Sequence, residues 1–229
     1  MPTTLAPSMQ RLGVGAGTAV VLLSLAYATV LSIGLLTLPS PDRQIQDPWF
    51  TLMEMLIIAI TPAMVALTAA LYSSASPERK SYALASLAFM SMTAVVSCSV
   101  HFAVLTLSHN PAFAGHEWAR LVFSFEWPSV AYALDILAWD VLFPLAALFA
   151  GATVQGGGLA IAVRRLLLVS GALALIGLAG VPLANMQVRN IGIIGYAVVF
   201  PIAAGLLAYL FRRTGSEVKH QQVRGTNGP

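Results

Sequence analysis

Four ionisable side chains lie inside otherwise apolar stretches of this chain: Glu54, His101, Asp135 and Asp140. An unpaired charge inside a bilayer costs several kcal/mol, so each of these residues needs a partner or a chemical role. A carboxyl group in apolar surroundings can keep its proton near neutral pH and act as a general acid, and a histidine can accept or relay that proton. The residue types therefore favour proton-transfer chemistry, with Glu54 as the acid, Asp135 as the base or cation stabiliser, and His101 assisting.

Asp135 stands in a stretch that is rich in aromatic residues. Tyr132, Asp135 and Trp139 are spaced i, i+3, i+7 and share one face of a helix. Asp140 lies about 140° round the helix from Asp135, so we do not expect the two to line one narrow groove. Asp135 is therefore the preferred partner of Glu54, and Asp140 is the second choice. Aromatic walls around a carboxylate suit an apolar substrate or a cationic intermediate, and they equally suit ordinary helix packing.

Six residues are candidates for contact with a substrate, because they are aromatic, amide or guanidinium side chains within or beside the apolar stretches. They are Trp139, Tyr132, Trp49, Asn185, Arg189 and Asn190. A structural alternative stands beside the catalytic assignments. Glu54 can pair with Arg189 or a hydroxyl group and only fix helix packing. A lone membrane histidine such as His101 is more often a packing residue than a ligand.

Six apolar stretches must position these side chains. They cover residues 13–38, 49–74, 82–108, 128–152, 166–184 and 191–211. Each is close to the ~20 residues that cross a bilayer as a helix. The chain is 58% hydrophobic and 9% charged, whereas soluble domains contain about 25% charged residues. The sequence therefore predicts an all-α, polytopic membrane bundle of six transmembrane helices, with no sizeable soluble domain.

The distribution of Lys and Arg predicts the orientation of the bundle. Nine of the 12 lie in the N-terminal tail, the second and fourth loops and the C-terminal tail. The positive-inside rule then puts both termini in the cytoplasm, and an even number of spans agrees with this. We expect a cytoplasmic tail at 1–12, a membrane domain at 13–211 and a disordered cytoplasmic tail at 212–229, in a protein of the cytoplasmic membrane.

The ionisable residues within the spans are confined to the outer part of the bundle. With a helical rise of ~1.5 Å per residue, Glu54, His101 and Asp135 lie roughly 7–10 Å below the outer ends of their helices. Asp140 is deeper, at ~18 Å, near the midplane. No Asp, Glu, Lys, Arg or His falls in the inner half of any predicted span. This asymmetry predicts a polar pocket that faces outward.

Two further features bear on such a pocket. Pro62, Pro144 and Pro201 lie mid-span in the three helices that run from the outer to the inner face. Bends at these prolines would splay the outer halves of the bundle and open a cavity, although membrane helices also tolerate proline freely. The loop 109–127 is predicted to form a short amphipathic helix on the outer surface, either as a lid over the cavity or as an interfacial anchor.

No cofactor or metal is expected. The spans contain no lysine for a retinal Schiff base, and their single histidine disfavours a haem held by two histidines. The segment that begins with His116 and Glu117 lacks the second histidine of a zincin, and the spacing of His101, His109 and His116 matches no recurrent zinc pattern. The net charge of +3 arises from basic residues at segment ends, which predicts contacts with membrane lipids and not with nucleic acid.

The sequence leaves three functions open and does not determine the oligomeric state. The first is an intramembrane acid–base enzyme, of cyclase or isomerase type, that acts on an apolar small molecule or lipid. The pairing of Glu54 with a later aspartate in a small helical bundle resembles integral-membrane terpene cyclases, which implies an isoprenoid substrate. The second is a small proton-coupled transporter. The third is a structural or accessory membrane subunit whose polar residues hold helices together.

Overall fold

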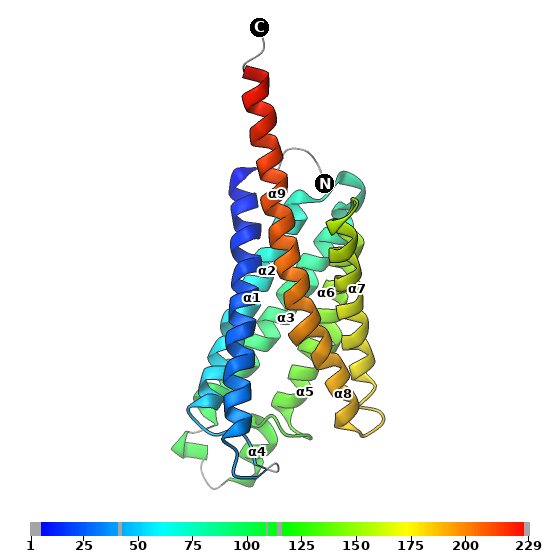
Figure 1. The fold of residues 1–229 in the computed structure, drawn as a ribbon. Coiled ribbons are helices and arrows are strands. Elements are labelled where there is room, and N and C mark those ends of the chain that lie inside the picture. The colour runs from blue at the N-terminus through cyan, green and yellow to red at the C-terminus, as the bar shows by residue number, and fades with distance from the viewer. Residues whose placement is uncertain (1–5, 41–42, 109, 114–115, 227–229) are drawn as a thin grey trace.

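The chain forms a bundle of long helices in a computed structural model, which describes residues 6–40, 43–108, 110–113 and 116–226 (Figure 1). Every regular element in this described part is helical. Six helical spans are long and apolar enough to cross a membrane. This confirms the predicted all-α, multi-pass architecture.

The six spans combine the helical elements in chain order. The first three are α1 (Pro7–Leu36), α2 (Trp49–Ser74), and η1 (Pro77–Arg79) continued by α3 (Lys80–Leu107). The fourth joins α5 (Val130–Ile136), η3 (Leu137–Leu142) and α6 (Phe143–Thr153). The fifth is α7 (Leu159–Leu178), and the sixth joins α8 (Met186–Ile193), η4 (Ile194–Val199) and α9 (Phe200–Thr226). The short elements η2 (Pro111–Phe113) and α4 (Glu117–Phe123) lie between the third and fourth spans.

The fifth span departs from its predicted bounds of 166–184 at both ends. α7 begins at Leu159, directly after two glycines with positive φ angles, 124° at Gly156 and 54° at Gly158. Because glycine adopts such angles without a steric penalty, the chain turns straight into the helix there. α7 ends at Leu178, so the connection to the sixth span is longer than predicted.

The sixth span extends beyond its predicted bounds of 191–211 at both ends. It begins at Met186, and Arg189 therefore lies inside a helix and not in a loop. It continues as α9 to Thr226, through most of the segment 212–229 for which we predicted a disordered tail. After Pro201 at the start of α9, the rest of this helix contains no proline that would end it. The last three residues of that segment lie outside the described part.

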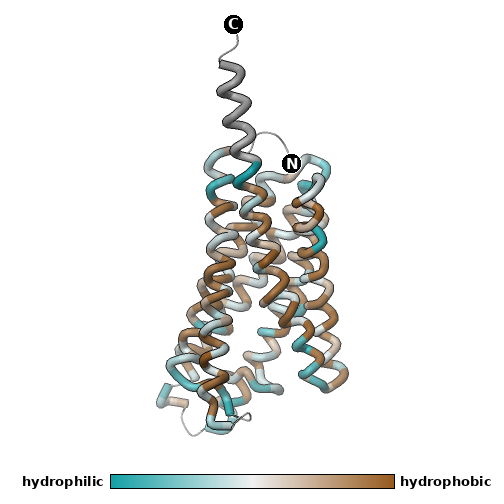
Figure 2. The backbone as a smooth tube through the Cα atoms, in the orientation of Figure 1, coloured by the Kyte–Doolittle hydropathy of each residue, from teal (hydrophilic) through white to brown (hydrophobic). Residues whose placement is uncertain are grey.

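The start of α1 and the far end of α9 lie at the same end of the bundle, here called the terminal end (Figure 1). The opposite end carries α4 and is called the α4 end. Apolar residues run along the helices, and polar residues gather towards their ends (Figure 2). The cytoplasmic location of the terminal end remains a prediction from the distribution of charge.

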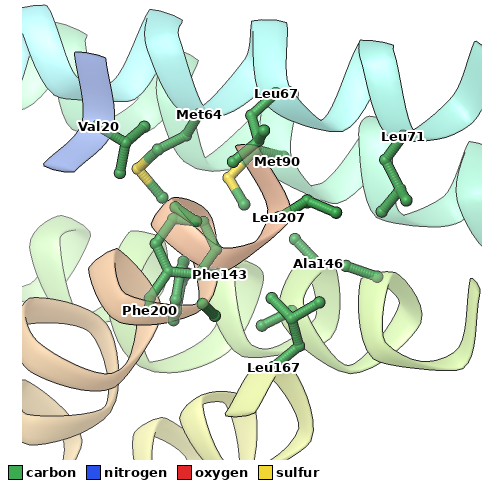
Figure 3. Close-up of a cluster of buried hydrophobic side chains, with 14 of the residues drawn as sticks. Val20, Met64, Leu67, Leu71, Met90, Phe143, Ala146, Leu167, Phe200 and Leu207 are labelled. Atoms are coloured by element: carbon green, nitrogen blue, oxygen red, sulfur yellow. The ribbon is translucent and has the colours of Figure 1, made fainter. Parts of the chain in front are cut away.

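Large apolar side chains fill the centre of the bundle and its terminal half. Met64 of α2, Met90 of α3, Phe143 of α6, and Phe200 and Leu207 of α9 are all buried. In Figure 3 these side chains converge from helices that are distant in the sequence. The buried hydroxyl groups within this core, such as those of Thr68, Ser86 and Thr93, donate to backbone carbonyl oxygens.

Two π-helical segments, η3 and η4, interrupt the fourth and sixth spans. Each is followed directly by a Phe-Pro pair, Phe143-Pro144 after η3 and Phe200-Pro201 after η4. A proline has no N–H group and its ring crowds the carbonyl four residues earlier, and the wider i→i+5 bonding accommodates this displacement. Pro62 stays within the continuous α2. The three predicted proline sites are therefore not equivalent.

α7 and α8 approach each other closely through glycines. A Cβ atom on Gly177 would lie 2.7 Å from the Cα of Gly192 and 3.0 Å from the carbonyl oxygen of Arg189. Backbone atoms cannot move away independently, so a side chain at Gly177 would push the whole of α8 outward. The absence of a side chain there therefore sets the position of α8.

We expect Gly177→Ala to lower the free energy of unfolding by about 1–3 kcal/mol, because the added methyl group overlaps fixed backbone atoms. Gly15→Ala on α1 is the matched control, since no atom lies within 4 Å of its added Cβ. The control should be neutral or slightly stabilising, because alanine has the higher helix propensity. Thermal unfolding of both variants in detergent measures the difference, and an unchanged midpoint for Gly177→Ala would contradict the close packing.

Candidate active site

Glu54 of α2 and His101 of α3 form a buried pair. Oε2 of Glu54 lies 2.7 Å from Nδ1 of His101, and each residue is only 3% exposed. Nε2 of His101 lies 3.4 Å from Oδ1 of Asp135 on α5, which is within ion-pair distance but without hydrogen-bond geometry. The ring of Phe125 covers the imidazole, with ring centroids 4.9 Å apart. One imidazole therefore stands between two carboxyl groups.

This arrangement suits proton relay. A neutral imidazole has one nitrogen that donates and one that accepts, and a protonated imidazole donates through both. His101 can thus take up a proton at one ring nitrogen and release one from the other without moving its ring. The sequence predicted Glu54 and Asp135 as partners, and the structure brings them together through His101.

Arg189 of α8 connects Asp135 to Asp140. Its Nη2 donates to Oδ2 of Asp135 at 2.8 Å, and its Nε donates to Oδ2 of Asp140 at 2.7 Å. The guanidinium lies over the ring of Tyr132, 4.6 Å from the centroid. Arg189 is only 4% exposed, although the sequence suggested a position at a helix end. The predicted alternative, a pair between Glu54 and Arg189, is replaced by the pairs of Glu54 with His101 and of Arg189 with the two aspartates.

Asp135 and Asp140 both face Arg189, although α-helical geometry predicts a separation of about 140°. The segment η3 covers Leu137–Leu142, and its i→i+5 bonding turns the chain less per residue than an α-helix does. Residues five apart therefore come close to one face, and the predicted angle is wrong for that reason. The two aspartates still differ, because Asp135 lines the cavity described below, whereas the fully buried Asp140 does not.

The cluster has more acidic than basic groups. Glu54, Asp135 and Asp140 face one permanent cation, Arg189, and one titratable base, His101. With every carboxyl ionised and the imidazole neutral, the cluster would carry two net negative charges, which burial in apolar surroundings disfavours. A neutral cluster therefore holds two additional protons shared among its carboxyl and imidazole groups.

A cavity of about 1240 Å³ adjoins this cluster in the α4 half of the bundle. Glu54, His101, Asp135 and Arg189 lie on its wall. Its volume exceeds the roughly 300–1,000 Å³ that is typical of small-molecule sites. Its floor consists of buried apolar residues, namely Val20, Ile60, Met64 and Phe200. Polar side chains line its α4 end, namely Arg43, Gln44, Gln46, Asp47, Arg120 and Glu126.

Besides Arg189, two other predicted substrate contacts line the cavity, namely Tyr132 and Trp139. The other three lie outside its lining. Trp49 packs beside Gly34 at the start of α2. Asn185 caps α8 by accepting from the backbone N–H of Gln187 at 3.0 Å, and Asn190 donates to the side chain of Gln187 at 2.9 Å. The two asparagines therefore serve local helix structure, as polar residues at helix ends often do.

Two tyrosines on the cavity wall were not among the predicted site residues. Tyr27 lies on α1 and Tyr196 lies in η4. Tyr196 packs against Trp139, with ring centroids 5.1 Å apart. The only signal in the sequence is that each is a tyrosine with a polar tip inside a long apolar stretch. These side chains reach the cavity because of how their two helices are rotated, and this rotation is set by packing against neighbouring helices.

The loop between the third and fourth spans covers the α4 end of the cavity. The predicted short helix is present as α4, and Phe123 and Phe125 line the cavity. Trp118 and Leu121 point away and are 47% and 58% exposed. The zinc possibility that included His109 concerns a residue outside the described part. Among the described residues, no group of three or more His, Cys, Asp and Glu could hold a metal ion.

No protein-family model, curated protein or solved structure matches this chain. Its function is therefore inferred from the geometry and chemistry of the site itself.

We expect Arg189→Leu to destabilise the protein by about 3–5 kcal/mol, because Asp135 and Asp140 would lose their buried cation. The double variant Arg189→Leu/Asp140→Leu should recover part of this loss, since one unpaired carboxylate is removed with the guanidinium. Thermal unfolding and the yield of monodisperse protein measure both effects.

The control for this prediction is Arg120→Leu, which removes an ion pair with Glu126 from a side chain that is 74% exposed. An exposed pair contributes about 0–1 kcal/mol, so the control should unfold close to the wild type. If Arg189→Leu were as stable as Arg120→Leu, the ion pairs of Arg189 would not hold the helices together.

Proposed function

We propose that this chain is an intramembrane acid–base enzyme that isomerises or cyclises an apolar, membrane-soluble molecule of lipid or isoprenoid type. The observation that carries the proposal is the imidazole of His101 between Glu54 and Asp135 on the wall of a largely apolar cavity. Such a site supplies a proton donor and a proton acceptor next to an apolar substrate. The positive-inside count supports a location of this cavity in the outer leaflet of the cytoplasmic membrane.

The proposed reaction conserves protons. Glu54, supplied through His101, donates a proton to one atom of the substrate, and Asp135 or Nε2 of His101 removes a proton from another. The electron pair released by the second step forms the new double bond, so no oxidant, reductant or co-substrate is consumed. A cationic intermediate would lie among carboxylates and the ring faces of Tyr27 and Tyr196, which stabilise positive charge.

Arg189 and Asp140 have a positioning role in this scheme. Arg189 occupies Oδ2 of Asp135 and leaves Oδ1 directed towards His101. Asp140 accepts from Nε of the same guanidinium, from a position outside the cavity lining. The Asp140 carboxylate therefore acts on the reaction only through Arg189 and Asp135.

The floor of the cavity favours an enzyme over a transporter. Val20, Met64 and Phe200 close the cavity towards the terminal end, and the apolar core of Figure 3 continues below them. Alternating access requires a route to both faces, usually lined by polar groups near the midplane. A purely structural subunit, in turn, has no need of a large cavity beside its buried charges.

We expect Glu54→Gln to lower turnover by about 10²–10⁴-fold while the protein stays folded, because the isosteric amide cannot donate an acidic proton. Untargeted lipid and metabolite profiling of membranes with and without the wild-type chain identifies the substrate–product pair. Turnover of that pair in proteoliposomes then compares the variants. Glu117→Gln, at an exposed position on α4, is the matched control and should retain full activity.

Two results would overturn the proposal. An active Glu54→Gln protein would remove this residue from the mechanism. Net flux of the same compound across the bilayer, without chemical change and abolished by Asp135→Asn, would establish the transporter in place of the enzyme.

A further inference from the structure

The cavity reaches the side of the bundle as well as its α4 end. Ala28 and Leu35 on α1 line one edge of it, and Ile193, Ala197 and Val198 line the other. All five residues are exposed, with Leu35 at 53% and Val198 at 52%. In a bundle whose six helices are membrane spans, exposed apolar residues on the side of the bundle face lipid tails.

This lateral gap exists because α1 and the sixth span are close only towards the terminal end. A Cβ on Gly13 would lie 2.5 Å from the ring of Phe211, and one on Gly17 would lie 2.8 Å from the Cβ of Ala208. At these glycines, α1 therefore packs directly against α9. Towards the α4 end, α1 and α8 diverge in the view of Figures 1 and 2.

We propose that the gap bounded by Ala28 and Leu35 on one side and by Ile193, Ala197 and Val198 on the other is a lateral portal. Through it, a single-chain lipid whose reacting end is uncharged or cationic reaches the Glu54–His101–Asp135 cluster from within the bilayer. The apolar chain lies in the portal, and the polar end lies at the cluster. The role of the reacting end rests on the proposed function, whereas the binding of the lipid does not.

The charge of the cluster determines which reacting end fits. Two carboxylates, those of Asp135 and Asp140, already pair with Arg189, so its positive charge is more than balanced before an anionic headgroup could bind. A carboxylate or phosphate at this depth would face three acidic side chains, and burying it unpaired is costly. An alcohol or amine finds acceptors in Glu54 and Asp135, and ring faces in Tyr27 and Tyr196.

The portal is tested with two photoactivatable probes in phosphatidylcholine proteoliposomes. One is a long-chain alcohol with a diazirine on its chain, and the other is the fatty acid of the same length. Mass spectrometry locates the label after irradiation. We expect the alcohol to label Tyr27, Tyr196 and residues beside them. The fatty acid should label them about tenfold less, a ratio that corresponds to ~1.4 kcal/mol of binding.

Ala28→Trp and Ala197→Trp should each reduce labelling by the alcohol about tenfold or more, since an indole at either edge fills the gap. Ala172→Trp is the matched control, because Ala172 is exposed on α7 and does not line the cavity. If a tryptophan variant fails to fold, Ala197→Cys in a Cys98→Ala background, alkylated with a bulky maleimide after folding, blocks the portal without a folding step.

The outcomes separate the portal from the reaction. Labelling that spreads evenly over lipid-facing residues, or that persists in the blocked variants, overturns the portal. Equal labelling by the fatty acid overturns the assignment of the reacting end. If labelling follows the portal but profiling detects no turnover, the enzyme proposal fails and the lipid site stands. If the blocked variants turn over substrate at the wild-type rate, the portal fails and the enzyme stands.

Discussion

The ion pairs of Arg189 with Asp135 and Asp140 join the fourth and sixth spans inside an apolar bundle. A buried guanidinium needs compensating partners, and here two carboxylates accept from Nε and Nη2 while the ring of Tyr132 lies against the guanidinium. Arg189 pairs with the two aspartates, and Glu54 pairs with His101. The position of this one cation therefore sets the order of partners along the cluster.

Irregular helix geometry makes that arrangement possible. The segment η3 turns Asp140 towards the same side as Asp135, and Gly192 leaves room for its carboxylate, since a Cβ there would lie 2.7 Å from Oδ1. The contact between Gly177 and Gly192 brings α8 close enough for Arg189 to reach both aspartates. Both η3 and the glycine contact depart locally from regular helical packing. Wider turns and bare glycines are common where a membrane protein must place polar groups in its interior.

The bundle is divided into two halves with different physical roles. In the terminal half, small and large apolar side chains form most of the packing, and α1 lies close against α9 at Gly13 and Gly17. In the α4 half, the helices separate around a cavity that contains the ionisable groups. A closed floor and an open side suit a molecule that arrives from the bilayer, reacts and returns to it. The closed floor also favours the proposed enzyme over a transporter, because alternating access requires a route to both faces.

The amino-acid sequence by itself determined the class of fold and the depth of the main ionisable groups. A bilayer requires apolar helices of a certain length, so six spans can be counted from the sequence; α2 has its predicted bounds of 49–74, whereas α7 covers 159–178 and not 166–184. A constant rise per residue likewise places Glu54, His101 and Asp135 at one level. Only the tertiary structure decided that Arg189 is buried, that Asp140 shares it with Asp135, and that two unpredicted tyrosines reach the cavity. Those outcomes depend on which helices are neighbours and how each is rotated, and such contacts join residues that are distant in the chain and carry no local pattern.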